Sequence, residues 1–270
     1  MENKRKLIGS LCVVLFFLLA GIKYKIIFLG IAQGIFEWIP ISSEGIVALF
    51  SEIFYKDLNP IDIALFLHFG TLLAVLFYFR KEWIEVVTLK NNSLLKFLII
   101  CTIVSLIVGF PVYKLIKQVA FGYLLLIIIG FGLILTSLLQ STEKRSFLTL
   151  TPLAIITGLL QGLSVIPGLS RSGSTIFGLS LGKLKPSEIL KISYMASVPV
   201  IFASSIYFLL KTPSLSLKGL PALFSSAFIG FLTLDMLMSL AKRINFAKFT
   251  FIFGVLCLIG GIIFFAGNYF

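Results

Sequence analysis

The chain has 270 residues, of which 59% are hydrophobic and only 13% charged, and its mean hydropathy is +1.09. Because a soluble domain is about half apolar and about a quarter charged, this composition excludes a water-soluble globule, a disordered chain and a disulfide-rich scaffold. The net charge is +12, but no soluble basic domain that would bind nucleic acid carries it. We therefore expect a helical membrane protein whose loops are basic.

The N-terminal segment carries three basic residues at 4–6 and an apolar stretch over 7–22. A signal peptide and a transmembrane helix both have this arrangement. No small-residue cleavage site precedes the basic residues at 23 and 25, so we expect an uncleaved transmembrane helix.

Six further apolar segments are each long enough to cross a bilayer, which takes about 20 helical residues. They lie at 61–79, 94–112, 121–140, 189–210, 220–240 and 249–268. Short basic loops separate them, as at Arg80-Lys81 and Lys144-Arg145. The pattern predicts an all-α, multi-pass protein of the cell membrane.

Two regions, 26–54 and 150–182, are apolar but interrupted by proline, glycine and clustered serine. Both contain Gly-x-x-Gln-Gly, starting at Gly30 and Gly158, and Gln33 and Gln161 are 128 residues apart, so the regions form an internal repeat. Lipid cannot satisfy the backbone groups that such interruptions free. We therefore expect two re-entrant helix–loop–helix hairpins, whose Gly-x-x-x-Gly pairs (Gly30/Gly34 and Gly158/Gly162) allow close helix approach.

The order of hairpins and spans predicts two repeats of opposite orientation. They cover 26–148 and 149–270, each a hairpin plus three spans, and follow an additional segment at 1–25. With residues 4–6 inside, fifteen Lys and Arg fall inside and seven outside, as the positive-inside rule requires. Inverted repeats place binding sites where broken helices meet, so we expect the two serine-rich tips to face each other.

Glu37 lies in an apolar arm of the first hairpin, where an ionisable group is costly unless it has a partner or a function. It is either a general base or cation ligand, or a carboxylate at the membrane rim. Gln33 lies one helical turn earlier and shares its face.

Arg171 is the basic residue of the second hairpin and lies among hydroxyl side chains. Its guanidinium fits phosphate oxygens, so an oxyanion site is favoured over a purely structural pair with Glu37. The other candidates for binding the anion are Gly168, Ser170, Ser172, Ser174 and Thr175 at this tip.

Ser42 and Ser43 at the first tip have two interpretations. Either serine can cap the following helix, or it can attack phosphorus if a base lies nearby. His68, the only histidine, is expected to be a packing or hydrogen-bonding residue, and the three cysteines to be buried apolar residues. Together these residues favour a phosphorylated amphiphile as ligand, with its head at the polar tips and its tail among the helices.

At these residues the chain resembles the undecaprenyl-diphosphate phosphatase family of the bacitracin-resistance type. The segments that carry the resemblance are 33–43, 68–76 and 167–175, and the last is similar to the family's Pro-Gly-x-Ser-Arg-Ser motif. The resemblance implies two inverted repeats and removal of the terminal phosphate from a C55 polyprenyl diphosphate, which recycles the lipid carrier for cell-wall glycan synthesis.

The resemblance also implies roles for individual residues. Glu37 becomes the key acidic residue, Arg171 holds the diphosphate, and Ser43 is a candidate nucleophile beside water. Gln33 and Ser42 join the substrate-binding set. A divalent cation, Mg²⁺ or Ca²⁺, assists, with Glu37 and Glu44 as candidate ligands.

One departure from the family pattern is Ile46, which stands where the family has a histidine with a catalytic role. Either activity is lost or another group compensates, and Glu44 is a nearby carboxylate that could act as base or ligand. A lipid-phosphate transporter of the same architecture is the alternative function. The sequence leaves open the prenyl length, the accessible membrane face and the oligomeric state, for which a homodimer is one candidate.

Overall fold

The computed structural model describes residues 25–39, 42–55, 59–119, 122–141, 148–182, 184–211, 219–240 and 246–267. The expected helix at 7–22 lies outside these residues, as do the tip proline Pro40, Cys12 and the basic loop at 144–145.

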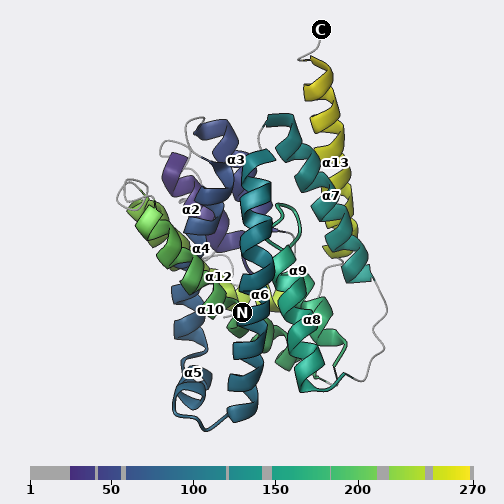
Figure 1. Ribbon diagram of the computed structural model, residues 1–270. Helices are drawn as coiled ribbons and strands as arrows, with labels where there is room; N and C mark the ends of the chain where they lie inside the picture. The colour runs from purple at the N-terminus through teal and green to yellow at the C-terminus, as the bar shows by residue number, and fades with distance from the viewer. Residues whose placement is uncertain are drawn as a thin grey trace, which may run out of the picture.

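The described residues form eleven α-helices joined by short connections (Figure 1). In chain order they are α2 (Lys25–Phe36), α3 (Ser43–Phe54), α4 (Pro60–Tyr78), α5 (Arg80–Val87), α6 (Asn92–Val119), α7 (Gly122–Ser141), α8 (Leu150–Leu163), α9 (Arg171–Ser180), α10 (Pro186–Lys211), α12 (Leu220–Leu240) and α13 (Phe246–Gly267).

Four of these helices, α4, α6, α7 and α10, are long and apolar enough to cross a membrane. They confirm four of the six expected spans. In α12 and α13 the apolar stretches among the described residues are shorter, at Leu220–Leu234 and Thr250–Ala266. The chain is therefore a multi-pass helical membrane protein.

The region after the first span differs from the expectation of a basic loop. Arg80 and Lys81 form the first turn of α5, a short helix with an exposed polar face. The next helix, α6, continues through Pro111 to Val119, well beyond the apolar segment that ends at 112. Hydropathy locates the apolar part of a helix, but backbone hydrogen bonds continue into its amphipathic end.

The two interrupted regions each form two helical arms joined by a short turn, as expected: α2 with α3, and α8 with α9. Serine caps the second arm in both cases. Ser42 accepts a hydrogen bond from the backbone N–H of Gly45 (3.2 Å), and Ser170 accepts one from that of Gly173 (3.1 Å). The sequence thus stops one helix and starts the next by the same local chemistry.

The first arms of the hairpins approach their neighbours through glycine. A Cβ atom on Gly34 of α2 would lie 2.8 Å from the backbone nitrogen of Gly230 on α12. On Gly162 of α8 it would lie 2.9 Å from the carbonyl oxygen of Ser105 on α6. These contacts confirm that the Gly-x-x-x-Gly pairs allow close approach, so each hairpin packs on a span from the other half of the chain.

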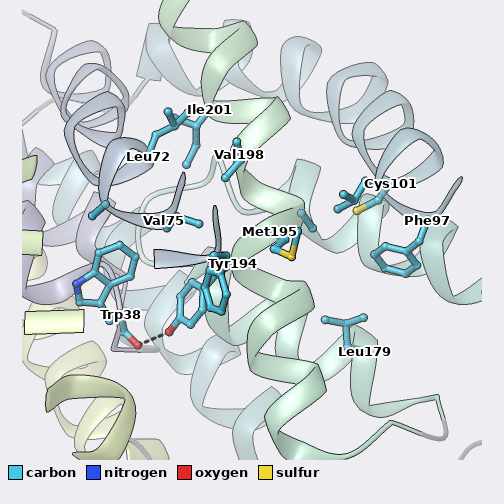
Figure 2. Close-up of a cluster of buried hydrophobic side chains, with 14 of the residues drawn as sticks. Trp38, Leu72, Val75, Phe97, Cys101, Leu179, Tyr194, Met195, Val198 and Ile201 are labelled. Atoms are coloured by element: carbon cyan, nitrogen blue, oxygen red, sulfur yellow. Dashed lines mark hydrogen bonds between the residues drawn. The ribbon is translucent and has the colours of Figure 1, made fainter. Parts of the chain in front are cut away.

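A buried apolar cluster surrounds Trp38 and Tyr194 (Figure 2). The two rings pack edge to face with centroids 5.6 Å apart, and the Tyr194 hydroxyl donates to the carbonyl oxygen of Trp38 (2.7 Å). The indole N–H of Trp38 donates to the carbonyl oxygen of Gly230 (3.1 Å). These contacts fix the end of α2 against α10 and α12. Cys101 belongs to the same cluster and is buried, as expected.

Candidate active site

The tips of the two hairpins are joined directly. Besides capping its own helix, the hydroxyl oxygen of Ser42 accepts a hydrogen bond from the backbone N–H of Gly168 (3.1 Å). A Cβ atom on Gly45 would lie 2.9 Å from that same nitrogen. Ser42 and Gly168 both have positive φ angles, of 64° and 92°. The expected opposition of the two tips is therefore a contact, and it requires glycine at 45.

The second tip is anchored on α7. Thr136 donates from its hydroxyl to the carbonyl oxygen of Gly168 (3.1 Å) and accepts from the backbone N–H of Ser170 (2.9 Å). Gly168 also lies against the backbone of Ile129, where a Cβ atom would be 2.2 Å from the carbonyl oxygen. These contacts hold the start of α9 in one position.

Glu37 is the centre of the polar contacts between the hairpins. It is buried, and its Oε2 atom accepts hydrogen bonds from Gln33 Nε2 (2.7 Å) and Ser43 Oγ (2.8 Å). His68 Nε2 lies 3.2 Å from the same oxygen. The other oxygen, Oε1, forms an ion pair with Arg171. One carboxylate therefore connects both hairpins with α4.

His68 belongs to this centre although the sequence did not single it out as a site residue. Its Nδ1 lies 2.8 Å from the carbonyl oxygen of Ala64, and its Nε2 faces Glu37. When Glu37 is ionised, both neighbours only accept, so a doubly protonated ring satisfies both contacts. Two features could have identified it, namely its being the only histidine and its place in a segment that resembles the family.

Arg171 begins α9 with one part of its guanidinium still available. Its NH2 group pairs with Glu37, and its plane lies near the ring of Tyr194, 5.8 Å from the centroid. Its NH1 group is buried and has no hydrogen-bond partner among the described residues. A buried, unsatisfied charged donor is costly, so this group is suited to an incoming anion.

A small polar cavity of about 10 Å³ lies between the tips. Seven of the residues expected from the sequence line it: Glu37, Ser42, Ser43, Glu44, Ser170, Arg171 and Ser172. His68 and Ile39 complete the lining. Both hairpins thus contribute hydroxyl and charged groups to one cavity.

Four other expected site residues do not line this cavity. Gln33 donates a hydrogen bond to the Glu37 carboxylate, and Gly168 adopts a positive φ angle in the turn before α9. Thr175 directs its hydroxyl to Ser193 (2.6 Å) and to backbone oxygens of α9. Ser174 is buried within α9. In this structure their contacts are with protein groups that position the cavity.

Glu44 is the second carboxylate of the polar cavity. Its side chain is buried, with a relative exposure of 6%, and its Oε1 atom has no hydrogen-bond partner among the described residues. Glu44 therefore places an unsatisfied acceptor beside the unsatisfied donor of Arg171.

A larger cavity, of about 170 Å³, extends from this place between α4, α6 and α10. Its walls are mainly apolar and include Leu106, Phe110, Val200 and Ile201. Glu44, His68 and Arg171 line both cavities. The polar space thus opens onto an apolar space between the helices.

Residues 26–263 match the family model described as bacitracin resistance protein BacA. The chain belongs to this family. Among its relatives are proteins named undecaprenyl-diphosphatase from Haloarcula marismortui (33% identical, covering 88% of this chain and 96% of the relative), Sulfurisphaera tokodaii (35%, 87% and 95%) and Thermosipho africanus (34%, 89% and 99%).

Membership of the BacA family directs attention to residue 46, where this chain departs from the motif that it otherwise resembles. Ile46 packs in the buried apolar cluster around Trp38 and lines neither cavity. The imidazole that contacts Glu37 comes from α4 instead, as His68.

Proposed function

We propose that this protein hydrolyses a polyprenyl diphosphate of the undecaprenyl type to the monophosphate and inorganic phosphate within the membrane. The reaction returns the lipid carrier for cell-envelope glycan synthesis. The observation that carries the proposal is the Glu37 carboxylate, which accepts from the Ser43 hydroxyl and pairs with Arg171 in one buried cavity. Relatives of similar length that bear the name undecaprenyl-diphosphatase support it.

The substrate lies across both cavities. Its diphosphate binds at the polar cavity, where the NH1 group of Arg171 and the hydroxyls of Ser170 and Ser172 bind its oxygens. The first isoprene units occupy the apolar cavity. Burial of hydrocarbon among Leu106, Phe110 and their neighbours contributes affinity in proportion to the apolar area covered.

Hydrolysis begins with proton transfer from Ser43 to Glu37. The Ser43 oxygen forms a bond to the terminal phosphorus, and the bond from that phosphorus to the bridging oxygen breaks. The electron pair leaves with the polyprenyl monophosphate, while Arg171 stabilises the charge on the transferring group. The proton that Glu37 took from Ser43 then passes to His68, which has given its own proton to the leaving oxygen. Water attacks the phosphoserine while Glu37 accepts a proton from that water. The bond between the phosphorus and the Ser43 oxygen breaks, His68 protonates this oxygen, and inorganic phosphate leaves. In the alternative path, Glu37 accepts a proton from a water molecule, and the oxygen of that water attacks the terminal phosphorus in place of Ser43.

His68 supplies the proton that the leaving oxygen needs. It lines the polar cavity, contacts Glu37 and has its other nitrogen fixed by Ala64. A proton donor held in this way contributes about 10²–10⁴-fold to a rate. In this proposal His68 is the group that compensates for isoleucine at 46.

A divalent cation belongs to the proposal, with the carboxylates of Glu37 and Glu44 as the donors that could hold it. When bound, such a cation neutralises charge on the diphosphate oxygens. The unsatisfied, buried Oε1 atom of Glu44 fits this requirement.

The architecture is proposed as two inverted repeats, with each hairpin entering the membrane from an opposite side. Two observations support it. The hairpin arm α2 packs on α12 and the arm α8 packs on α6, so the halves exchange equivalent contacts. The hairpin α2–α3 lies in the upper part of Figure 1 and α8–α9 in the lower part, with their tips in contact.

The test is release of inorganic phosphate from a C55 polyprenyl diphosphate by purified protein in detergent, with Mg²⁺, Ca²⁺ or EDTA. We expect cation-dependent release that Glu37→Gln and Arg171→Ala both abolish, while the exposed control Glu85→Gln leaves it unchanged. Folded protein that binds the lipid without releasing phosphate would refute the hydrolase. Lipid translocation by such a protein would identify a transporter.

A further inference from the structure

We propose that Glu44, rather than Glu37, is the residue that ligates the divalent cation, and that it does so together with oxygens of the bound diphosphate. The inference rests on the proposed function and specifies which of the two buried carboxylates has this role.

Glu37 has little capacity left for a cation. Its Oε2 atom already accepts from Gln33 and Ser43 and faces His68, and its Oε1 atom pairs with Arg171. A carboxylate oxygen has about two lone-pair directions. A cation at Glu37 would have to displace these donors.

Glu44 lines the same polar cavity but differs from Glu37 in its hydrogen bonding. Its Oε1 atom is buried without any hydrogen-bond partner among the described residues, although an isolated buried carboxylate carries a large desolvation cost. A partner that arrives with the substrate removes that cost. A hard cation such as Mg²⁺ is the natural partner, because it prefers oxygen ligands.

The position of Glu44 also fits a cation bound to a diphosphate. Glu44 lines the polar cavity beside Arg171 and lines the apolar cavity as well. It therefore stands where the diphosphate joins the prenyl chain, within reach of oxygens on both phosphates. Arg171 approaches the same group with its free NH1 atom, so the donor and the cation bind different oxygens.

The protein offers a cation few ligands of its own. Among the described residues no group of three or more His, Cys, Asp or Glu side chains is arranged to hold a metal ion. Mg²⁺ is commonly held by one or two carboxylates and substrate phosphates while it keeps several waters. We therefore expect weak cation binding by the free protein and tight binding once the diphosphate is present.

The experiment uses the full chain in detergent with Mn²⁺ and a prenyl methylenediphosphonate, which cannot be hydrolysed. Free Mn²⁺ is measured by electron paramagnetic resonance with and without the diphosphonate, for wild type, Glu44→Gln and Glu52→Gln. Glu52 is the matched control because it lies on α3 too, outside both cavities, and its amide could still accept from Gly122.

We expect the diphosphonate to tighten Mn²⁺ binding at least tenfold in wild type and in Glu52→Gln, and Glu44→Gln to lose that tightening. Binding of the diphosphonate without cation should survive in Glu44→Gln, since Arg171 is intact. Its melting temperature without ligand should equal or exceed that of wild type, because a neutral amide is buried at no greater cost than a carboxyl group that can ionise.

Tight Mn²⁺ binding by Glu44→Gln would overturn the inference, and loss of hydrolysis in that same variant would make Glu44 a base instead. If wild type binds the diphosphonate and hydrolyses the C55 lipid but Mn²⁺ binding does not depend on Glu44, the inference about Glu44 is wrong and the proposed hydrolase function stands. If wild type neither binds the diphosphonate nor releases phosphate, the proposed function fails with it.

Discussion

Glu37 and Arg171 are separated by 134 positions in the sequence and form a buried ion pair between the two hairpins. The pair joins the two hairpins and lies at the cavity where we propose that hydrolysis takes place. The carboxylate pairs with one end of the guanidinium, and the NH1 group at the other end has no hydrogen-bond partner among the described residues.

Arg171→Lys tests whether activity requires the planar, multiple-donor geometry of the guanidinium or only its positive charge. Lysine can pair with Glu37 but cannot present a second fixed donor to phosphate. We expect kcat/KM for the C55 diphosphate to fall by about 10²–10³-fold, as for loss of one donor to a developing charge. The exposed control Arg80→Lys should retain wild-type kinetics. Equal activity of both variants would show that a point charge suffices.

Ser43→Ala distinguishes serine from water as nucleophile. Ser43 donates to Glu37, so a serine nucleophile predicts near-complete loss of phosphate release and a phosphoserine that rapid acid quenching traps in wild type. The matched control is Ser141→Ala on α7, whose hydroxyl donates only within its own helix in the described contacts. A Ser43→Ala enzyme that keeps a tenth or more of the rate would assign the attack to water.

His68→Gln removes the titratable proton while retaining an N–H donor near Glu37. We expect kcat to fall by about 10²–10⁴-fold with little change in KM. Because an acid must be protonated to act, wild-type activity should decline as pH rises through the acid's titration, and the variant should lack that decline. A kcat–pH profile of the same shape in both enzymes would leave His68 only a positioning role.

Ala203→Phe tests the apolar cavity as the site of the prenyl chain. Ala203 lines that cavity on α10, so a phenyl ring there should occupy part of its volume. We expect KM for the C55 diphosphate to rise several-fold, with a smaller effect on a short prenyl diphosphate. Ile206→Phe, at an exposed position on the same helix, is the control. An equal rise in KM for short and long substrates would place the chain elsewhere.

Gly34→Ala tests the close packing of the first hairpin on α12. The added Cβ would lie 2.8–3.0 Å from three atoms of α12, two of them backbone atoms, so we expect destabilisation of about 1–3 kcal/mol. Gly260→Ala on α13 meets no atom within 4 Å and should stabilise by up to about 1 kcal/mol through helix propensity. Melting temperatures in detergent measure both, and a Gly34→Ala protein as stable as wild type would contradict the packing.

Local chemistry explains why the sequence predicted the hairpins. Proline, glycine and serine interrupt apolar segments, and each interruption ends one helix and supplies a cap for the next, through Ser42 and Ser170. The repeated Gly-x-x-x-Gly pairs likewise indicated close packing, because small side chains permit it whatever the partner helix. The identity of the partner, α12 for one hairpin and α6 for the other, is not encoded at this local level.

The sequence by itself determined a multi-pass helical protein with an acidic tip and a basic tip, since hydropathy and helix interruption depend on neighbouring residues. Only the tertiary structure brought His68 from α4 onto Glu37, turned Ile46 into the apolar cluster, and left Glu44 with an unsatisfied oxygen. These outcomes depend on how helices far apart in the chain rotate and pack against one another. A lone histidine or glutamate carries no sequence signal for the face on which it will lie.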